Sequence, residues 1–197
     1  MNYDFNRIPD ELKNTPQWIV WKSEIRNDKP TKIPYQANGQ FAKSNDRSSW
    51  STFIEAQQAF STGRYDGVGF MFSKEDDFIG IDIDDCIEDG AYSDLSRDLV
   101  DTIDSYTELS PSNKGLHIII KGKIPLRGPG TGKKNPELGI EIYRHGRYFT
   151  FTGAVVRSVG VEERTEALKT IWGKYIESEE DMSTKVLPKR ESSNKYI

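Results

Sequence analysis

Short alternating runs of apolar and polar residues, separated by turn signals, extend through most of the chain. Strands are predicted at 18–21 and 68–72, and a proline inside 31–35 makes that segment an edge strand, because proline cannot donate to a sheet hydrogen bond. Thr52 and Glu55 have the spacing of a capping box and begin a short predicted helix that ends near residue 60. The first third of the chain therefore indicates a small α/β unit.

The remaining chain continues the mixed pattern. Helices are predicted from Ser93 or Asp94 to Ile103 and over 163–176, where apolar residues recur at helical spacing. We expect 68–72 to form a hairpin with 78–84, and 139–143 to form another with 147–152. The basic, glycine-rich segment 122–138 is predicted to be a mobile loop. Further extended segments are predicted at 106–109 and 116–121.

The pattern predicts one domain over 1–176 and a polar tail or linker over 177–197. The tail lacks hydrophobic periodicity and has the composition of a solvated segment. The fold class is α/β, with strands and helices mixed along the chain.

Three predicted strands carry ionisable residues at alternate positions. Because neighbouring residues of a strand point to opposite faces, Asp82 and Asp84 share a face that excludes Ile81 and Ile83. The same rule sends Glu141 and His117 away from their isoleucine neighbours. If the three strands share a sheet, one face gathers three carboxylates and a histidine. Like charges there repel, so we expect a compensating cation, and oxygen ligands suit Mg²⁺ or Mn²⁺.

Charge is distributed unevenly along the sequence. Residues 75–108 contain 13 acidic side chains and one basic one, whereas residues 121–157 contain eight basic and two acidic ones. Such neighbouring blocks are typical of a site for cations and an anionic substrate, although two solvated surfaces would give the same pattern. The net charge of the 197 residues is −4, which predicts weak binding of nucleic acid at physiological salt.

Composition excludes several classes of protein. No apolar run approaches the ~20 residues that a membrane span needs, and no signal-peptide pattern opens the chain. A single cysteine, Cys86, excludes an internal disulfide framework, and with two histidines it supplies too few ligands for a usual structural zinc site. We therefore expect a cytoplasmic protein whose 22 aromatic residues (four Trp, nine Tyr, nine Phe) build its core.

Three segments follow one another along the chain: Ile81-Asp82-Ile83-Asp84, Ser110 to His117, and Ile140-Glu141-Ile142-Tyr143 with Gly146 to Thr150 behind it. Taken in this order, they resemble the archaeo-eukaryotic primase superfamily, in particular the primase-polymerase domains of phages, plasmids and other mobile elements. The likeness extends roughly over residues 18–153. It implies an RRM-like antiparallel catalytic sheet joined to an N-terminal α/β unit. Many relatives continue into a helicase domain, which would explain the polar tail.

The resemblance implies a DNA primase-polymerase that uses two-metal nucleotidyl transfer on single-stranded DNA. Asp82, Asp84 and Glu141 would hold two Mg²⁺ or Mn²⁺ ions and form the catalytic centre. The expected partners are a template and primer, nucleoside triphosphates, and a helicase domain or protein. The residues expected to contact the nucleotide are Ser112, Lys114, His117, Arg144 and Arg147.

Two other classes of protein stay open at this point. A D-x-D glycosyltransferase binds a nucleotide diphosphate through a cation, but it leaves the turn before His117 without a role. A non-catalytic nucleic-acid-binding module would not need three carboxylates, which repel phosphates unless a metal is bound. A P-loop at 128–133 is rejected, because Arg127 stands where the motif needs a glycine. Template-dependent incorporation would separate these classes.

Overall fold

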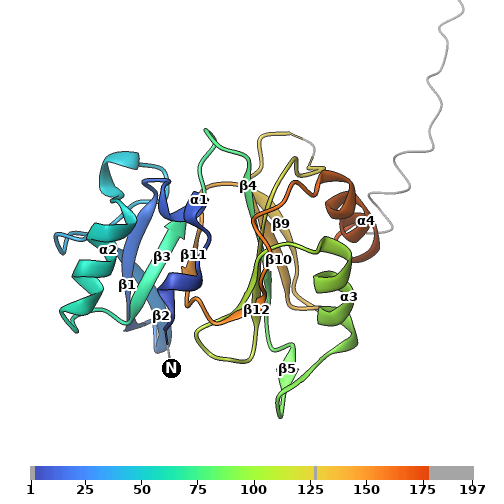
Figure 1. Cartoon of the computed structure of the whole chain (residues 1–197), viewed down its shortest axis with the longest axis horizontal. Coiled ribbons are helices and arrows are strands. Elements are labelled where there is room, and N and C mark those ends of the chain that lie inside the picture. The colour runs from blue at the N-terminus through green and yellow to red at the C-terminus, as the bar shows by residue number, and fades with distance from the viewer. Residues whose placement is uncertain (1–2, 127, 178–197) are drawn as a thin grey trace, which may run out of the picture.

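The computed structural model of the protein describes residues 3–126 and 128–177 and shows a mixed α/β fold on two antiparallel sheets. In Figure 1, α2 (Phe53–Ser61) lies on the outer side of the first sheet, and α3 (Asp94–Ile103) and α4 (Thr165–Tyr175) lie on the far side of the second. None of the helices in these two ranges is long and apolar enough to cross a membrane. Apart from Glu177, the predicted tail 177–197 lies outside the described residues.

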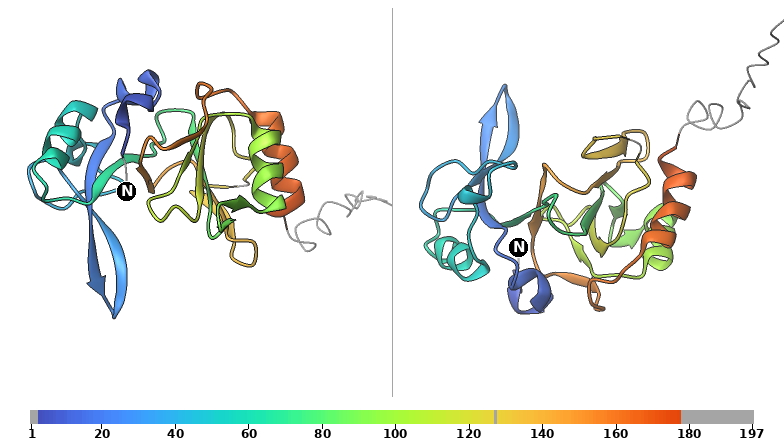
Figure 2. Two further views of the ribbon diagram at one scale, coloured as in Figure 1. Left: turned by 60° about the horizontal axis from the view of Figure 1, so that its bottom comes forward. Right: turned by 90° about the horizontal axis from the view of Figure 1, so that it is seen from above.

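The N-terminal sheet has the strand order β11-β3-β1-β2. Its edge strand β2 confirms the prediction for 31–35, but the prediction for 18–21 is too short, because β1 continues to Arg26. Asn27 and Asp28, both at positive φ, join β1 to β2 in a tight turn. The resulting hairpin, residues 22–32, projects from the body (Figure 2) and is called the arm below. The strands are β1 (Trp18–Arg26), β2 (Lys29–Tyr35), β3 (Gly67–Met71) and β11 (Tyr148–Phe151).

Helix α2 packs on this sheet through Phe53, whose ring centroid lies 4.8 Å from that of Trp18. The predicted capping box is confirmed: Thr52 Oγ1 accepts from the Glu55 N–H, and Glu55 Oε2 accepts from the Thr52 N–H at 2.8 Å. Short helical turns before and after the first hairpin were not predicted. They are η1 (Phe5–Arg7), α1 (Asp10–Lys13) and η2 (Arg47–Ser49).

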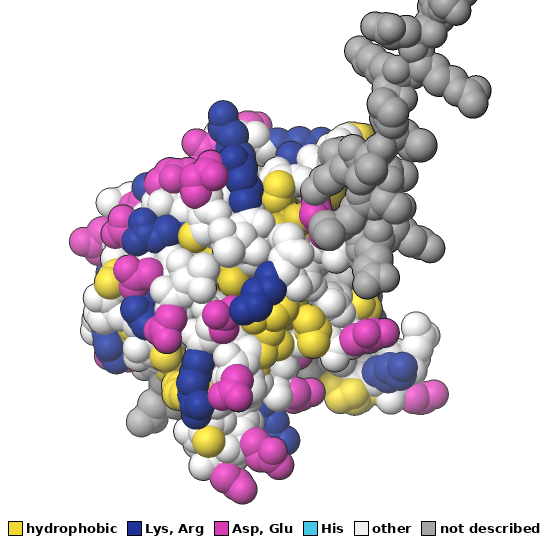
Figure 3. All heavy atoms as spheres, turned by 90° about the vertical axis from the view of Figure 1, so that its right-hand side faces the viewer, with side chains coloured by type: hydrophobic (Ala, Val, Ile, Leu, Met, Phe, Trp, Pro, Cys, Tyr) yellow, Lys and Arg dark blue, Asp and Glu magenta, His cyan; other side chains and the backbone are white. Residues whose placement is uncertain are grey.

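The second sheet has the order β12-β7-β8-β4-β10-β9, and its isoleucine-rich face packs on α3 (Asp94–Ile103) and α4 (Thr165–Tyr175). Ser93 caps α3 as predicted, accepting from the Ser96 N–H. On the face that Figure 3 shows, acidic and basic side chains intermingle with apolar ones at several places. The strands are β4 (Phe78–Ile83), β7 (Thr107–Leu109), β8 (Leu116–Lys121), β9 (Gly132–Asn135), β10 (Ile140–Tyr143) and β12 (Val155–Arg157); β5 (Ile87–Glu88) and β6 (Ala91–Tyr92) form a separate small hairpin.

Both hairpins predicted between consecutive strands are wrong. Strand β3 belongs to the N-terminal sheet and β4 to the second, and β10 and β11 are divided in the same way. The intervening turns, 72–77 and 144–147, carry the chain from one sheet to the other. The prediction of a mobile loop over 122–138 is also wrong in part, because residues 132–135 form β9 and pair with β10.

The two sheets meet through aromatic side chains. Phe78 and Tyr143 of the second sheet share a core with Phe72 and Phe149, which come from beside and within the N-terminal sheet. Gly80 makes this contact possible, because a Cβ there would lie 2.5 Å from the Phe149 ring. The apolar junction covers one end of the helix-free face of the second sheet and leaves the other end to polar side chains.

Candidate active site

Polar side chains on five neighbouring strands form one row across the second sheet. In the strand register each member lies directly opposite the next, so all of them point to the face that the helices do not cover. This confirms the expectation that His117, Asp82 and Glu141 share a face. The polar row, in order, is Glu108, His117, Asp82, Glu141 and Lys134.

Asp82 occupies the centre of the row, between His117 on β8 and Glu141 on β10. Its side chain is only 24% exposed. Burial, with a smaller effect from the Glu141 carboxylate, raises the pKa of Asp82 to about 6, even though Lys32 acts in the opposite direction. The protein therefore holds a carboxylate where its negative charge is unfavourable.

Asp84 lies just beyond the end of β4, two residues from Asp82. Its N–H donates to the Gly139 carbonyl at 2.8 Å, which ties the end of β4 to the segment before β10. Burial and the charges of Asp82 and Glu141 raise the pKa of Asp84. The three predicted metal-binding carboxylates thus act on one another electrostatically.

His117 is oriented by the edge of the other sheet. Its Nδ1 donates to the Thr150 carbonyl of β11 at 2.9 Å, which leaves Nε2 facing Asp82 Oδ1 at 3.5 Å. Burial lowers the pKa of His117 to about 4, so the ring is neutral and presents a lone pair at Nε2. A hydrogen bond from Nε2 to a phosphate would require the doubly protonated ring.

Glu108 belongs to the row but was missed by the sequence analysis. It is completely buried and accepts three hydrogen bonds, from the Thr152 N–H at 2.8 Å, the Gly153 N–H at 2.9 Å and the Tyr106 hydroxyl at 2.6 Å. Burial raises its pKa to about 7. Strand β11 is at the edge of its sheet, so one of its sides has no strand partner. Glu108 and His117 satisfy the polar backbone groups on that open side of β11 and just after it.

Arg147 approaches the row through Tyr143. Its guanidinium carbon lies 5.1 Å from the centroid of the Tyr143 ring, and the Tyr143 hydroxyl interacts with both Arg147 and Glu141. Burial is the main cause that raises the pKa of Tyr143. The structure thus brings Arg147, a predicted phosphate ligand, to the Glu141 side of the row.

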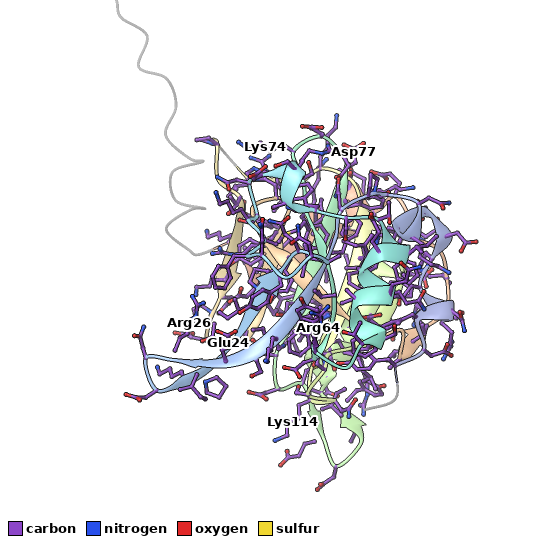
Figure 4. All side chains as sticks on the ribbon, turned by 90° about the vertical axis from the view of Figure 1, so that its left-hand side faces the viewer. Glu24, Arg26, Arg64, Lys74, Asp77 and Lys114 are labelled. Carbon is purple, nitrogen blue, oxygen red and sulfur yellow. The ribbon has the colours of Figure 1, made fainter. Side chains whose placement is uncertain are left out.

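The predicted ligands Ser112 and Lys114 lie on the turn before β8. This turn and the β5–β6 hairpin line a groove of about 900 Å³ that also includes Asp85, the neighbour of Asp84. Gly115 allows the turn to approach β4, because a Cβ there would lie 2.7 Å from the Ile83 carbonyl oxygen. Lys114 lies at the same end of the molecule as the β5–β6 hairpin (Figure 4).

Arg144 is not brought to the polar row. Its guanidinium donates to the carbonyls of Gly128 and Gly130, at distances down to 2.8 Å, and so anchors the basic loop. It lines a different groove, of about 540 Å³, beside Lys74 and Asp77. Figure 4 shows these two residues at the end of the molecule away from Lys114. The geometry gives Arg144 a role in loop structure, and its nucleotide contact stays a prediction.

Lys32 is a second residue that the sequence analysis missed. It lies on β2, and its charge lowers the pKa of both Asp82 and His117. Its ammonium lies 5.7 Å from the centroid of the Trp21 ring and makes no ion pair within the part of the chain that the structure describes. A lysine in an edge strand gives no sequence signal of this placement, because the placement depends on how the two sheets meet.

The donor set suits a hard divalent cation. Asp82, Asp84 and Glu141 offer only oxygen ligands, and their mutual repulsion would be relieved by a bound cation. No three His, Cys, Asp or Glu side chains within 3–126 and 128–177 are gathered closely enough to enclose an ion as they stand. Binding would therefore draw the carboxylates together.

Comparison with known proteins finds a similar phage protein. Over 169 residues, 84% of this chain, the sequence is 36% identical to the DNA primase-polymerase of Nitratiruptor phage NrS-1. The aligned part spans 23% of that protein, so this chain corresponds to less than a quarter of its relative. No protein-family model matches the chain.

Proposed function

Since the chain belongs with the primase-polymerase domains of the archaeo-eukaryotic primase type, we propose that it catalyses template-directed nucleotidyl transfer from nucleoside triphosphates on single-stranded DNA, releasing pyrophosphate, in the replication of a mobile element. The observation that carries this proposal is the placement of Asp82 between Glu141 and His117 on three adjacent strands. Asp82 and Asp84, whose pKa values are raised, suit two divalent ions and a polyphosphate together with the carboxylate of Glu141.

The residues of the chain have separate tasks in this proposal. Asp82, Asp84 and Glu141 would hold two Mg²⁺ or Mn²⁺ ions, which when bound supply charge neutralisation at the triphosphate and a more acidic 3′-hydroxyl. Arg147 would orient the triphosphate with its planar guanidinium, held near the site by Tyr143. Ser112 and Lys114 would contact phosphate oxygens from the turn before β8. His117 would contact them from the row once its Nε2 takes up a proton, which the negative charge of the triphosphate favours.

Incorporation of labelled nucleotide on single-stranded DNA tests the proposal directly. We expect a product only when template and either Mg²⁺ or Mn²⁺ are present, and reactions with and without a primer show whether the domain starts chains. Product that forms without a template would contradict template-directed nucleotidyl transfer. A folded protein that binds divalent ions and single-stranded DNA but never incorporates would favour the non-catalytic binding module.

Lys32 provides a prediction about the nucleotide. Because its ammonium acts on Asp82 and His117 and makes no ion pair among the described residues, we expect it to bind the triphosphate. Lys32→Met should raise the KM for nucleotide roughly 10- to 100-fold, the value of one charge-assisted hydrogen bond, and change kcat much less. Steady-state incorporation at varied nucleotide concentration measures both constants.

Lys29→Met is the matched control for Lys32→Met. Lys29 lies on the same strand but at the tip of the arm, opposite Arg26. It should leave the KM for nucleotide unchanged. Equal effects of the two variants would show that the arm matters only through its overall charge, and that Lys32 has no specific contact.

A further inference from the structure

Three aromatic rings and two arginines form a continuous line on the N-terminal sheet. The ring centroids of Phe41 and Tyr35 lie 5.1 Å apart, and those of Tyr35 and Tyr65 lie 6.0 Å apart. At one end the guanidinium carbon of Arg26 lies 5.7 Å from the Phe41 centroid, and at the other that of Arg64 lies 5.8 Å from the Tyr65 centroid. We call these five residues the aromatic ladder.

The ladder lies on a different face from the residues that act on the polar row. Tyr35 and Arg26 alternate with Lys32 and Trp21 along the paired strands β1 and β2, so they point to the opposite face of the sheet. Phe41 bridges to Tyr35 and is 58% exposed. Figure 4 shows Arg26 on the arm and Arg64 near α2 on the same viewed side of the molecule. The ladder is therefore an accessible surface outside the candidate active site.

We propose that the aromatic ladder binds single-stranded nucleic acid. Bases would stack on the exposed Phe41 ring and its neighbours, and Arg26 and Arg64 would contact backbone phosphates. Aromatic faces flanked by cations give binding that tolerates any base sequence, which is what a template requires. Aromatic residues and arginine are also enriched in protein interfaces, but a single line of rings with a guanidinium at each end matches the alternating bases and phosphates of one strand. The inference rests on the proposed function, because a template-directed polymerase has to hold a single strand.

The carboxylate of Glu24 contacts the ladder, and loss of its charge should strengthen DNA binding, whereas loss of a ladder residue should weaken it. Glu24 accepts a short hydrogen bond from the Tyr35 hydroxyl and lies 3.7 Å from the Arg26 guanidinium. Its negative charge opposes a phosphate at Arg26. Glu24→Gln should therefore strengthen binding of single-stranded DNA, whereas loss of a merely structural contact would not.

The experiment measures binding of a fluorescein-labelled oligothymidine to the full 197-residue chain by anisotropy, in low salt with EDTA and no nucleotide. Phe41→Ala should weaken binding at least about fivefold, the lower value for one stacked base. Arg64→Gln should weaken binding and reduce the slope of log affinity against log salt by about 0.7, the value for one phosphate contact. Phe41→Tyr, which keeps a ring, should bind as the wild type does.

Matched controls lie elsewhere on the surface. Ile54→Ala removes an apolar side chain that is 64% exposed on α2, and Arg97→Gln removes an arginine paired with Asp94 on α3. Both should bind as the wild type does, and thermal midpoints establish that every variant is folded. Wild type that does not bind, or Phe41→Ala and Arg64→Gln that bind equally well, would overturn the inference.

The same data separate this inference from the proposed function. Binding of single-stranded DNA that depends on the ladder residues, without any nucleotide incorporation, would support the ladder as a binding site and contradict the proposed polymerase activity. Template-dependent incorporation, together with an affinity for single-stranded DNA that no ladder variant changes, would support the polymerase activity and contradict the binding role of the ladder.

Discussion

Replacing Asp82 by asparagine should abolish nucleotide incorporation and also make the metal-free protein more stable at pH 7. Incorporation should fall by at least roughly a thousandfold, because the central ligand for the divalent ions is lost. The gain in stability follows from burial: the pKa of Asp82 is raised to about 6 in the folded chain, so the ionised side chain opposes folding. We expect the free energy of unfolding to increase by on the order of 2 kcal/mol, measured by denaturant titration in EDTA.

The pH dependence of this gain has a definite sign. In the unfolded chain an aspartate has a pKa of about 3.9, below its folded value, so the unfavourable charge develops as the pH rises from about 4 to 6. The difference in stability between Asp82→Asn and wild type should therefore be largest above pH 6 and vanish near pH 4. Asp77→Asn, an exposed change near the opposite end of β4, is the control and should alter neither stability nor incorporation. An Asp82→Asn protein that is less stable than wild type at pH 7 would contradict the raised pKa.

Glu108→Ala should be the most destabilising single change in the polar row. The substitution removes the carboxylate that accepts from the Thr152 and Gly153 N–H groups, and no other acceptor among the described residues replaces it. It also leaves the Tyr106 hydroxyl without its acceptor. Each buried donor left unsatisfied costs about 1–3 kcal/mol, so we expect a loss of roughly 3–5 kcal/mol in the free energy of unfolding. Thermal and denaturant unfolding near pH 5, below the folded pKa of Glu108, measure the loss. At pH 8 the ionised buried carboxylate itself opposes folding of the wild type, so the difference should be smaller there.

Glu137→Ala is the control for the Glu108 variant. The Glu137 side chain is exposed on the segment after β9, so its loss should change stability by no more than about 0.5 kcal/mol. If Glu108→Ala unfolded with the same midpoint as Glu137→Ala, the buried carboxylate would not be what secures the edge of β11.

Alternation of side chains along single strands predicted the carboxylate face, whereas strand pairing was mispredicted. The faces of Asp82, Glu141 and His117 follow from local pattern alone, because a strand embedded in isoleucines has one apolar side. The two hairpins were wrong because short turns such as 144–147 look the same whether the chain reverses within one sheet or passes to another. Only contacts distant in sequence, such as the Phe72–Phe149 ring pair, decide between these outcomes.

The residues that were missed depend on the same distant contacts. Glu108 lies in a three-residue strand, too short for alternation to distinguish a buried face from an exposed one. The signal that was available is an acid flanked by Thr107 and Leu109 directly before the turn to His117. The sequence predicted the same phosphate contact for Arg144 and Arg147. In the structure the Arg144 guanidinium faces loop carbonyls, whereas the Arg147 guanidinium faces the Tyr143 ring. Their difference arises where the chain leaves one sheet for the other.

The division of β10 and β11 between two sheets also limits how the chain can be shortened for expression. Strand β11 covers β3 in the N-terminal sheet, although it comes after most of the second sheet in sequence. A fragment that stops before residue 148 would expose the β3 edge, with its unpaired backbone groups and the apolar side chains Val68 and Phe70. Exposed edges of this kind recruit strands from other molecules, so such fragments should aggregate. A soluble minimal version of the N-terminal half therefore has to retain β11 together with the first third of the chain.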